Sequence, residues 1–402
     1  MLKSGDKWVP HLLCAIVGIS AWIEINGIFS ELGLMKSLPE GRAIASIIVV
    51  IVQIGNLVPL LFSLLPTKPE LRWSMVIVLS IGVSSLVFLA FLWDRTAIVF
   101  GVERSLMLYV GTFMAAGADC LSNIVFWPYV GQFPRSYITA MGTGESLSSA
   151  VSAIVASSQK AIGFSPSAFF IVLVVIVLCC STAFAVLETR FAPRLQAEAR
   201  QSSGTLPKTA TDMDESTVAE SESIASPQPS PWKADLPMLA VIAGIAFVQN
   251  GLNPSLLPFA CKGYSNAHFI SQNALFVASP IMSISASFFK PRKSIVPAIC
   301  VWIATSIFII VCAALPGPVA SDQTTGTAIM ATTAILSGSA LAYSKVSAML
   351  ALRSREAPVS ACSKEFMKKL MTAAGTAMQV GSVLGAASMF TLVQLQVFPS
   401  YK

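Results

Sequence analysis

The residues best suited to chemistry lie inside a hydrophobic stretch near the start of the chain, residues 9–30. Its middle reads Ser20-Ala-Trp-Ile-Glu-Ile-Asn-Gly, so Trp22, Glu24 and Asn26 stand among apolar side chains. At the depth of a bilayer, polar groups are costly unless they face a protein interior or a water-filled cavity. An Asn-Gly pair also weakens a helix, which lets backbone groups reach a ligand. The stretch therefore predicts a polar binding site within a membrane span.

The same pattern returns in the second half of the chain, as Gln249-Asn250-Gly251 inside the apolar stretch 236–260. The fifth apolar stretch of each half also matches, because Thr139-Ala-Met-Gly-Thr143 resembles Thr372-Ala-Ala-Gly-Thr376. Two polar-interrupted spans at equivalent places indicate a parallel internal repeat. We expect two helical bundles that face each other across a transport pathway with a central site.

Further candidate residues lie at helical spacing in other apolar stretches. Asp119, Ser122, Asn123 and Phe126 form one stripe, which either lines a cavity or hydrogen-bonds neighbouring helices. For Glu145 the sequence leaves open a cation partner, a substrate hydroxyl, titration during transport, or plain solvation.

Lys345 either belongs to the site or extends to the membrane surface. Among further amides near the predicted pathway, Asn56 lies deeper in its span than Gln272 and is the better candidate. The predicted cavity is rich in amides, hydroxyls and aromatic rings and poor in fixed charge. This chemistry favours an uncharged, planar, hydrogen-bonding solute, and the lack of an arginine clamp speaks against a phosphate or an amino acid.

The composition is that of a polytopic, all-α membrane protein. Of the 402 residues, 54% are hydrophobic and 11% are charged, whereas soluble chains spend about a quarter of their residues on charge. Eleven stretches are long and apolar enough to cross the ~30 Å hydrocarbon core. They are 9–30, 43–65, 73–93, 105–130, 136–161, 167–188, 236–260, 266–289, 294–315, 325–350 and 370–397.

The eight cysteines form no Cys-x-x-Cys pair and the chain has only two histidines, so we expect neither a disulfide framework nor a metal site, and no cofactor. No basic run interleaved with aromatic residues indicates nucleic acid.

Positive charge in the connections orients the chain. With the N-terminus in the cytoplasm, inside segments carry 18 lysines and arginines and outside segments carry 7. This bias predicts a cytoplasmic N-terminus and an extracellular C-terminus. Residues 190–235 are rich in proline and serine and are predicted to be a disordered cytoplasmic linker. It divides the chain into a six-helix bundle, 1–189, and a five-helix bundle, 236–402.

The motifs together resemble the eukaryotic riboflavin transporters, solute carrier family 52. The resemblance is carried by Asn26-Gly-Ile-Phe-Ser-Glu31-Leu, Gly55-Asn56, Asp119-Cys120, Asn250-Gly251 and Tyr343-x-Lys345-Val346. It implies a major-facilitator-like fold of eleven spans, also resembling the equilibrative nucleoside transporters, and uptake of riboflavin at the plasma membrane without ATP. It also implies that Asn26, Glu31 and Asn250 belong to the site.

The resulting hypothesis is a riboflavin transporter that works by alternating access in the lipid bilayer and is not an enzyme. The predicted substrate-binding residues are Trp22, Asn26, Glu31, Asn56, Asn123, Phe126, Glu145, Gln159, Gln249, Asn250 and Lys345, and none is expected to be catalytic. A transporter of another neutral heterocycle, such as a nucleoside, is the nearest alternative. An intramembrane enzyme and a receptor without transport are alternatives of other classes.

Overall fold

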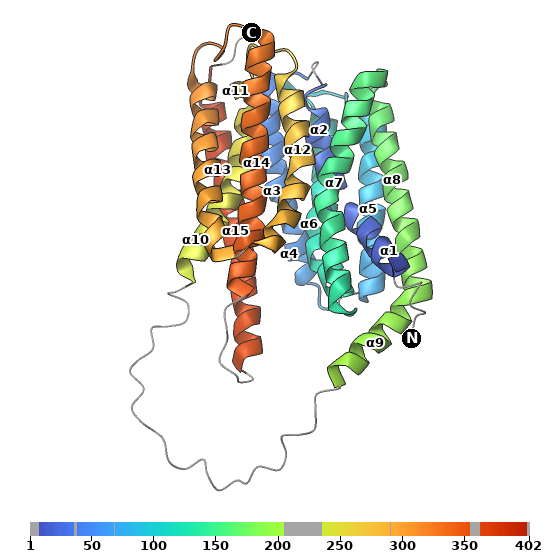
Figure 1. Ribbon diagram of the computed structural model, residues 1–402. Helices are drawn as coiled ribbons and strands as arrows, with labels where there is room; N and C mark the ends of the chain where they lie inside the picture. Colours follow the sequence, from blue (N-terminus) through green and yellow to red (C-terminus); the bar gives the residue numbers. More distant parts are fainter. Residues whose placement is uncertain are drawn as a thin grey trace, which may run out of the picture.

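The computed structural model is almost entirely helical and describes residues 8–35, 38–67, 69–204, 235–289, 291–353 and 362–399. Long, near-parallel helices run between two ends of the molecule (Figure 1). We call the end where α1 begins the lower end, and the end where α15 finishes the upper end. The first helix is broken, because α1 (Trp8–Ile19) and α2 (Ile23–Glu31) meet at a bend of 50°.

The rest of the first half contains five further helical passages. They are η2 (Gly41–Ala43) with α3 (Ile44–Gly55) and α4 (Leu57–Ser63), α5 (Leu71–Leu92), α6 (Leu106–Val130), α7 (Arg135–Ile162), and α8 (Pro166–Val186) continued by η3 (Leu187–Phe191) and α9 (Ala192–Gly204). A short antiparallel hairpin of β1 (Ala97–Val99) and β2 (Val102–Arg104) links α5 to α6.

The second half contains five helical passages. They are α10 (Leu236–Phe247) with the π-turn η4 (Val248–Leu252) and α11 (Asn253–Ala260), α12 (Ala267–Ser285) with η5 (Ala286–Phe288), α13 (Pro291–Ala314), α14 (Gln323–Arg353) and α15 (Cys362–Gln394). Each expected apolar stretch therefore falls on a helix.

Within the described residues, eight helices are long and apolar enough to cross a membrane, and the bent pair of α1 and α2 adds a ninth. The helices α7 and α12 do not join them, because serine, asparagine and glutamine lower their hydropathy. The predicted number of eleven spans stays a prediction. The two exceptions are informative, since α7 and α12 pack against each other between the two halves (Figure 1).

The helices form two bundles that correspond to the two halves of the chain. In the first, α1 and α2 pack on α7, and α5 packs on α6 and α8. In the second, α14 packs on α12 and α13, and α10 packs on α15. Besides α7 and α12, the helix α3 joins the bundles through its contacts with α11 and α15.

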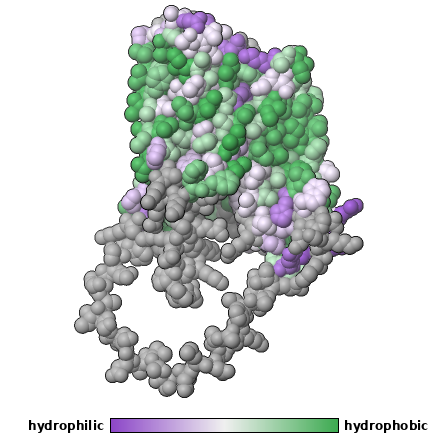
Figure 2. Space-filling view, in the orientation of Figure 1, coloured by the Kyte–Doolittle hydropathy of each residue, from purple (hydrophilic) through white to green (hydrophobic). Residues whose placement is uncertain are grey.

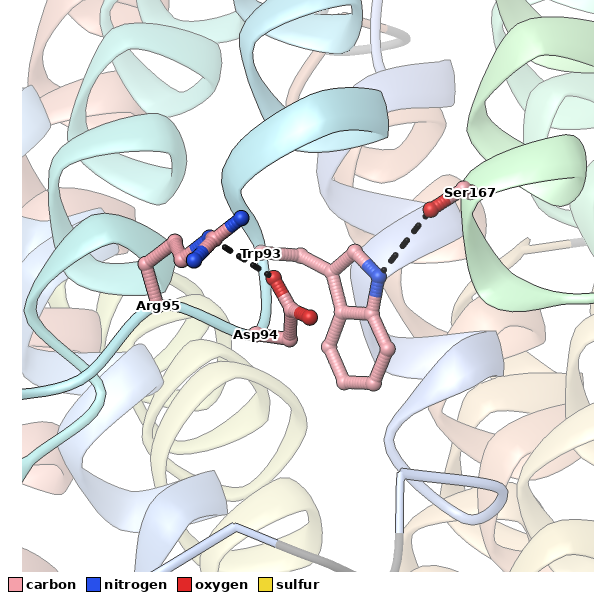
Figure 3. A network of polar contacts seen from close by, with 4 residues as sticks. All are labelled: Trp93, Asp94, Arg95 and Ser167. Carbon is pink, nitrogen blue, oxygen red and sulfur yellow. Dashed lines mark hydrogen bonds and ion pairs between the residues drawn. The ribbon is translucent and has the colours of Figure 1, made fainter.

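Apolar side chains cover the sides of the molecule between its ends, while hydrophilic residues gather toward the two ends (Figure 2). The upper boundary of this apolar zone is marked where α5 finishes beside the start of α8. There Trp93 Nε1 donates a hydrogen bond to Ser167 Oγ at 3.3 Å, and the exposed Asp94 and Arg95 pair at 3.8 Å (Figure 3). Tryptophan at such a boundary is typical of membrane proteins.

The predicted linker, 190–235, differs from the structure at its start. The helix α8 continues through η3 and α9 to Gly204, because residues 190–200 are rich in alanine, arginine, leucine, glutamine and glutamate, which favour helix. Leu187, Ala192 and Leu195 on this extension are buried. Residues 205–234 of the predicted linker lie outside the described residues.

Candidate functional site

The break in the first helix exposes polar groups where the two bundles meet. Trp22 precedes α2 and is half-buried, and Asn26 lies one turn further along. Asn26 Nδ2 donates a hydrogen bond to Ser148 Oγ on α7 at 2.9 Å. The amide thus has one donor occupied by a neighbouring helix, and its carbonyl oxygen remains an acceptor that a ligand can use.

The second half repeats this contact. Asn250, in the π-turn η4, donates from Nδ2 to Ser382 Oγ on α15 at 2.8 Å. Asn26 and Asn250 therefore make equivalent bonds from the first to the fifth helical passage of their halves, as the predicted internal repeat requires. Close packing supports the second contact, because a Cβ at Gly251 would come within 2.4 Å of the Gly385 backbone.

Two oppositely charged side chains, one from each bundle, attract each other near the same level. Glu145 on α7 accepts a hydrogen bond from Trp22 and is attracted electrostatically to Lys345 on α14. Lys345 also lines a pocket in the second bundle, together with Ile242, Ile245, Ala246, Gln249, Asn250 and Met378. The pocket has only about 10 Å³ of accessible volume, far below the usual range of ligand pockets, roughly 300–1,000 Å³. Its lining comes from the second bundle alone, and in this state it is too small to hold a substrate.

A second polar cluster lies nearer the upper end. Gln159 Nε2 on α7 donates to Glu31 Oε1 at the end of α2, at 2.9 Å, and both side chains are buried. Asn273 Nδ2 on α12 reaches the carbonyl oxygen of Ser30 at 3.4 Å. A Cβ at Gly33 would lie 2.8 Å from Phe269 Cβ, so the two backbones touch there as well. The contacts of Asn273 and Phe269 join the bundles in their upper half, while the bond between Gln159 and Glu31 lies within the first bundle.

The remaining predicted site residues lie apart from the pocket. Asn56 is half-buried on α3's C-terminal side and donates to Gln53 Oε1 on the same helix, at 3.2 Å. Asn123 on α6 is half-buried. Phe126 is 2% exposed and belongs to the apolar core of the first bundle. The structure therefore brings six predicted residues to one level of the molecule, which we call the central level: Trp22, Asn26, Glu145, Gln249, Asn250 and Lys345. Glu31 and Gln159 lie together in the upper cluster.

The two serines that hold the central amides, Ser148 and Ser382, were not among the predicted residues. A signal existed in the repeat, because both lie ten residues or fewer after the Gly-Thr of the matching motifs. Asn253 was also missed; it is buried and donates from Nδ2 to Ser337 Oγ at 3.0 Å. Among the described residues, no group of three or more His, Cys, Asp or Glu side chains is placed to hold a metal ion.

Comparison with known proteins identifies relatives over nearly the whole chain. The sequence model described as "Solute carrier family 52, riboflavin transporter" matches residues 6–162 and 157–400. Riboflavin transporter member 3-A of Danio rerio is 30% identical, with 96% of this chain and 95% of the relative covered. Member 3 of Homo sapiens is 25% identical with 98% and 97% covered, and riboflavin transporter rft-1 of Caenorhabditis elegans is 28% identical with 95% of each covered.

Two solved structures share the fold at 12% identity. The nucleoside transporter NupG has a TM-score of 0.56 with 96% of this chain and 92% of that chain covered. The transporter PepTSo has a TM-score of 0.57 with 96% and 90% covered. The chain therefore shares its overall fold with these two transporters.

Proposed function

Because the chain belongs to solute carrier family 52, the riboflavin transporter family, we propose that it carries riboflavin across a membrane by alternating access between its two bundles. The observation that supports this most directly is the pair of equivalent amides, Asn26 and Asn250, each held by a serine at the junction of the bundles. A two-fold set of amides suits a flat heterocycle with acceptors and donors on two edges.

The groups around the central level divide the recognition of the substrate between them. Asn26 and Asn250 bind the polar edges of the ring system, and the indole of Trp22 stacks on its face. Glu145 and Lys345 attract each other in this state. When the substrate is present, they bind its hydroxyl groups instead. No bond of the substrate is made or broken in this scheme, so the protein acts as a transporter and not as an enzyme.

The contacts of the upper half explain how access alternates. In this structure the bundles touch through Gly33 and Phe269 and through Asn273, while the pocket beside Lys345 lies below them. Because the pocket is smaller than usual ligand pockets, the bundles separate to admit a substrate. Rocking about the central level then closes one end while it opens the other.

We place the protein in the plasma membrane with its N-terminus in the cytoplasm, which makes the upper end extracellular. The distribution of lysine and arginine supports this orientation. Epitope tags added to each terminus and probed on intact cells test it. Only the C-terminal tag is expected to react with antibody before the cells are permeabilised.

The function is tested by uptake of labelled riboflavin into cells that lack their own carrier and into proteoliposomes of the purified protein. Unlabelled riboflavin and lumiflavin are expected to compete, and adenosine is not. Asn26→Ala and Asn250→Ala remove one ligand hydrogen bond each and are expected to lower uptake about tenfold at unchanged surface expression. Asn266→Ala, in the exposed turn before α12, is the matched control and is expected to keep full uptake.

Binding without accumulation in proteoliposomes would indicate a receptor, and competition by adenosine alone would indicate a nucleoside carrier. Full uptake by both asparagine variants would overturn the assignment of the site.

A further inference from the structure

A pair of acidic side chains is buried beside the break in the first helix, away from the central pocket. Glu24 on α2 and Asp119 on α6 are each 1% exposed, and their carboxyl groups are hydrogen-bonded to each other. Gly82 on α5 makes room for the pair, because a Cβ there would collide with Glu24 Oε1. The arrangement therefore depends on three helices that meet at this point.

The surroundings of the pair contain no described cation. The neighbours of the carboxyl groups are Gly82 on α5, Cys120 on α6 and Cys180 on α8. The nearby Ser85, Ser122 and Ser152 donate to backbone carbonyl oxygens. Among these neighbours only the two thiols titrate, and a thiol cannot supply a positive charge. Glu24 Oε2 and Asp119 Oδ1 have no hydrogen-bond donor among the described residues.

A bound proton explains how the two carboxyl groups can be in contact. Two carboxylate oxygens both accept hydrogen bonds, so two carboxyl groups bond to each other only when one of them carries a proton. Two ionised carboxylates in contact, buried and without a cation, would also repel each other strongly. The pair therefore holds at least one proton and carries at most one negative charge.

The backbone shows which residue carries the charge. Asp119 Oδ2 accepts a hydrogen bond from the backbone N–H of Ile25 at 3.1 Å, in the first turn of α2, whose N-cap residue Trp22 makes no side-chain cap. A helix N-terminus stabilises a negative charge. This bond favours Asp119 as the carboxylate that caps α2, with Glu24 as the acid that donates its proton to Asp119.

We propose that Glu24 and Asp119 form a proton-binding site that fixes the break in the first helix and so sets the position of Asn26. Ser122 Oγ supports the same break by donating to the carbonyl oxygen of Ala21 at 3.1 Å. Loss of the proton leaves two buried negative charges in contact, which forces α2 away from α6. Ile25 is the neighbour of Asn26 in the chain, so this movement displaces the amide from the central level.

The protonated acid is detected without transport, by infrared spectroscopy of the purified full-length protein at neutral pH in ordinary and heavy water. The carbonyl band of a buried protonated carboxylic acid is expected in the wild type and is expected to lose intensity equal to one acid in Glu24→Gln. Asp119→Asn is expected to lose the same band, since Glu24 then becomes a carboxylate that accepts from the asparagine amide. Glu70→Gln, on the exposed start of α5, is the control and keeps the band.

Identical carbonyl bands in the wild type and in both pair variants would overturn the proposal. Glutamine at position 24 has the size of the protonated acid and supplies an N–H donor in place of its O–H. This variant is therefore expected to fold, and its melting temperature verifies this.

The consequence for transport is measured separately and rests on the proposed riboflavin uptake. Wild-type uptake is expected to fall about tenfold per pH unit above the pH at which the carbonyl band disappears, as one proton is lost. Glu24→Gln is expected to keep its uptake across this range. If neither protein takes up riboflavin at any pH, the proposed function fails while the infrared result stands. A Glu24→Gln profile that declines with the wild type would overturn the proposed role of the proton.

Discussion

The packing of η4 against α15 gives a prediction that can be worked out from distances. A Cβ on Gly251 would lie 2.4 Å from Gly385 C and 2.6 Å from its Cα, whereas ordinary contact begins at 3.4 Å. The atoms that it meets belong to a backbone and cannot rotate away. Gly251→Ala therefore pushes the two helices apart by about 1 Å, the difference between these distances.

This displacement has a cost in stability and in the site. Overpacking of this kind costs about 1–3 kcal/mol. The bond from Asn250 Nδ2 to Ser382 Oγ, now 2.8 Å, lengthens past the usual limit of about 3.2 Å when the helices separate. We therefore expect Gly251→Ala to melt below the wild type and to lose riboflavin uptake.

The control is Gly244→Ala, two turns earlier in the same helical passage. A Cβ there meets Trp302 Cη2 at 3.7 Å, an ordinary contact. Alanine also favours helix over glycine by about 1 kcal/mol, so this variant is expected to melt at or above the wild-type temperature. Thermal unfolding of the detergent-purified proteins, followed by size-exclusion chromatography, compares the three. A Gly251→Ala protein as stable as Gly244→Ala would refute the packing argument.

Three further predictions concern groups outside this contact. Burial would raise the pKa of Glu40, but hydrogen bonds from Tyr109 and Ser105 outweigh it and hold the pKa below its usual value. These bonds stabilise the fold above the ordinary pKa of glutamate and are lost as the pH falls through the lowered value. At neutral pH, Glu40→Gln should therefore lower the free energy of unfolding by about 1 kcal/mol, after screening by solvent, and should lower the melting temperature. At strongly acidic pH the variant and the wild type should melt at the same temperature. Lys345→Glu is expected to lower the melting temperature by placing like charges together, and the exchange with Glu145→Lys should restore part of it, with a coupling of about 1 kcal/mol; no coupling in this double-mutant cycle would contradict the link between the bundles. Gly33→Val is expected to push the bundles apart at the upper end, where Gly33 contacts Phe269. Asn273→Cys then serves as a reporter, and its thiol is expected to react faster with a membrane-impermeant reagent when Gly33→Val is also present. An unchanged rate of reaction would count against closure at that end.

Much of this architecture follows from composition and local pattern. The π-turn at Asn250 falls on the Asn-Gly pair that the sequence singled out in the second half. In the first half the helix breaks before Ile23, and Asn26-Gly27 lies inside the regular helix α2, so the expected weak point was placed a few residues too late. Helix ends were also predictable, since they follow the limits of the apolar runs. The extension of α8 to Gly204 was missed, because a polar segment of helix-forming residues looks like a linker when only hydrophobicity is followed.

The partners of the polar residues were not predictable in the same way. Asp119 and Ser122 form part of a regular stripe on α6, yet they bind the backbone of the broken helix, about 100 residues away in the chain. Phe126 belongs to the same stripe and lies in the apolar core. Spacing along one helix shows which side chains share a face, but the neighbour of that face depends on how all the helices are packed.

The modest hydropathy of α7 and α12 bears on how the protein is made. Helices of this kind partition poorly into lipid by themselves and need a polar face to be covered as they leave the translocation machinery. While the ribosome is still making the second half, α1 and α2 can shelter one side of α7, but its side toward α12 has no cover. We therefore expect the two halves to depend on each other for stable insertion, so that either one expressed alone is degraded and the two expressed together survive.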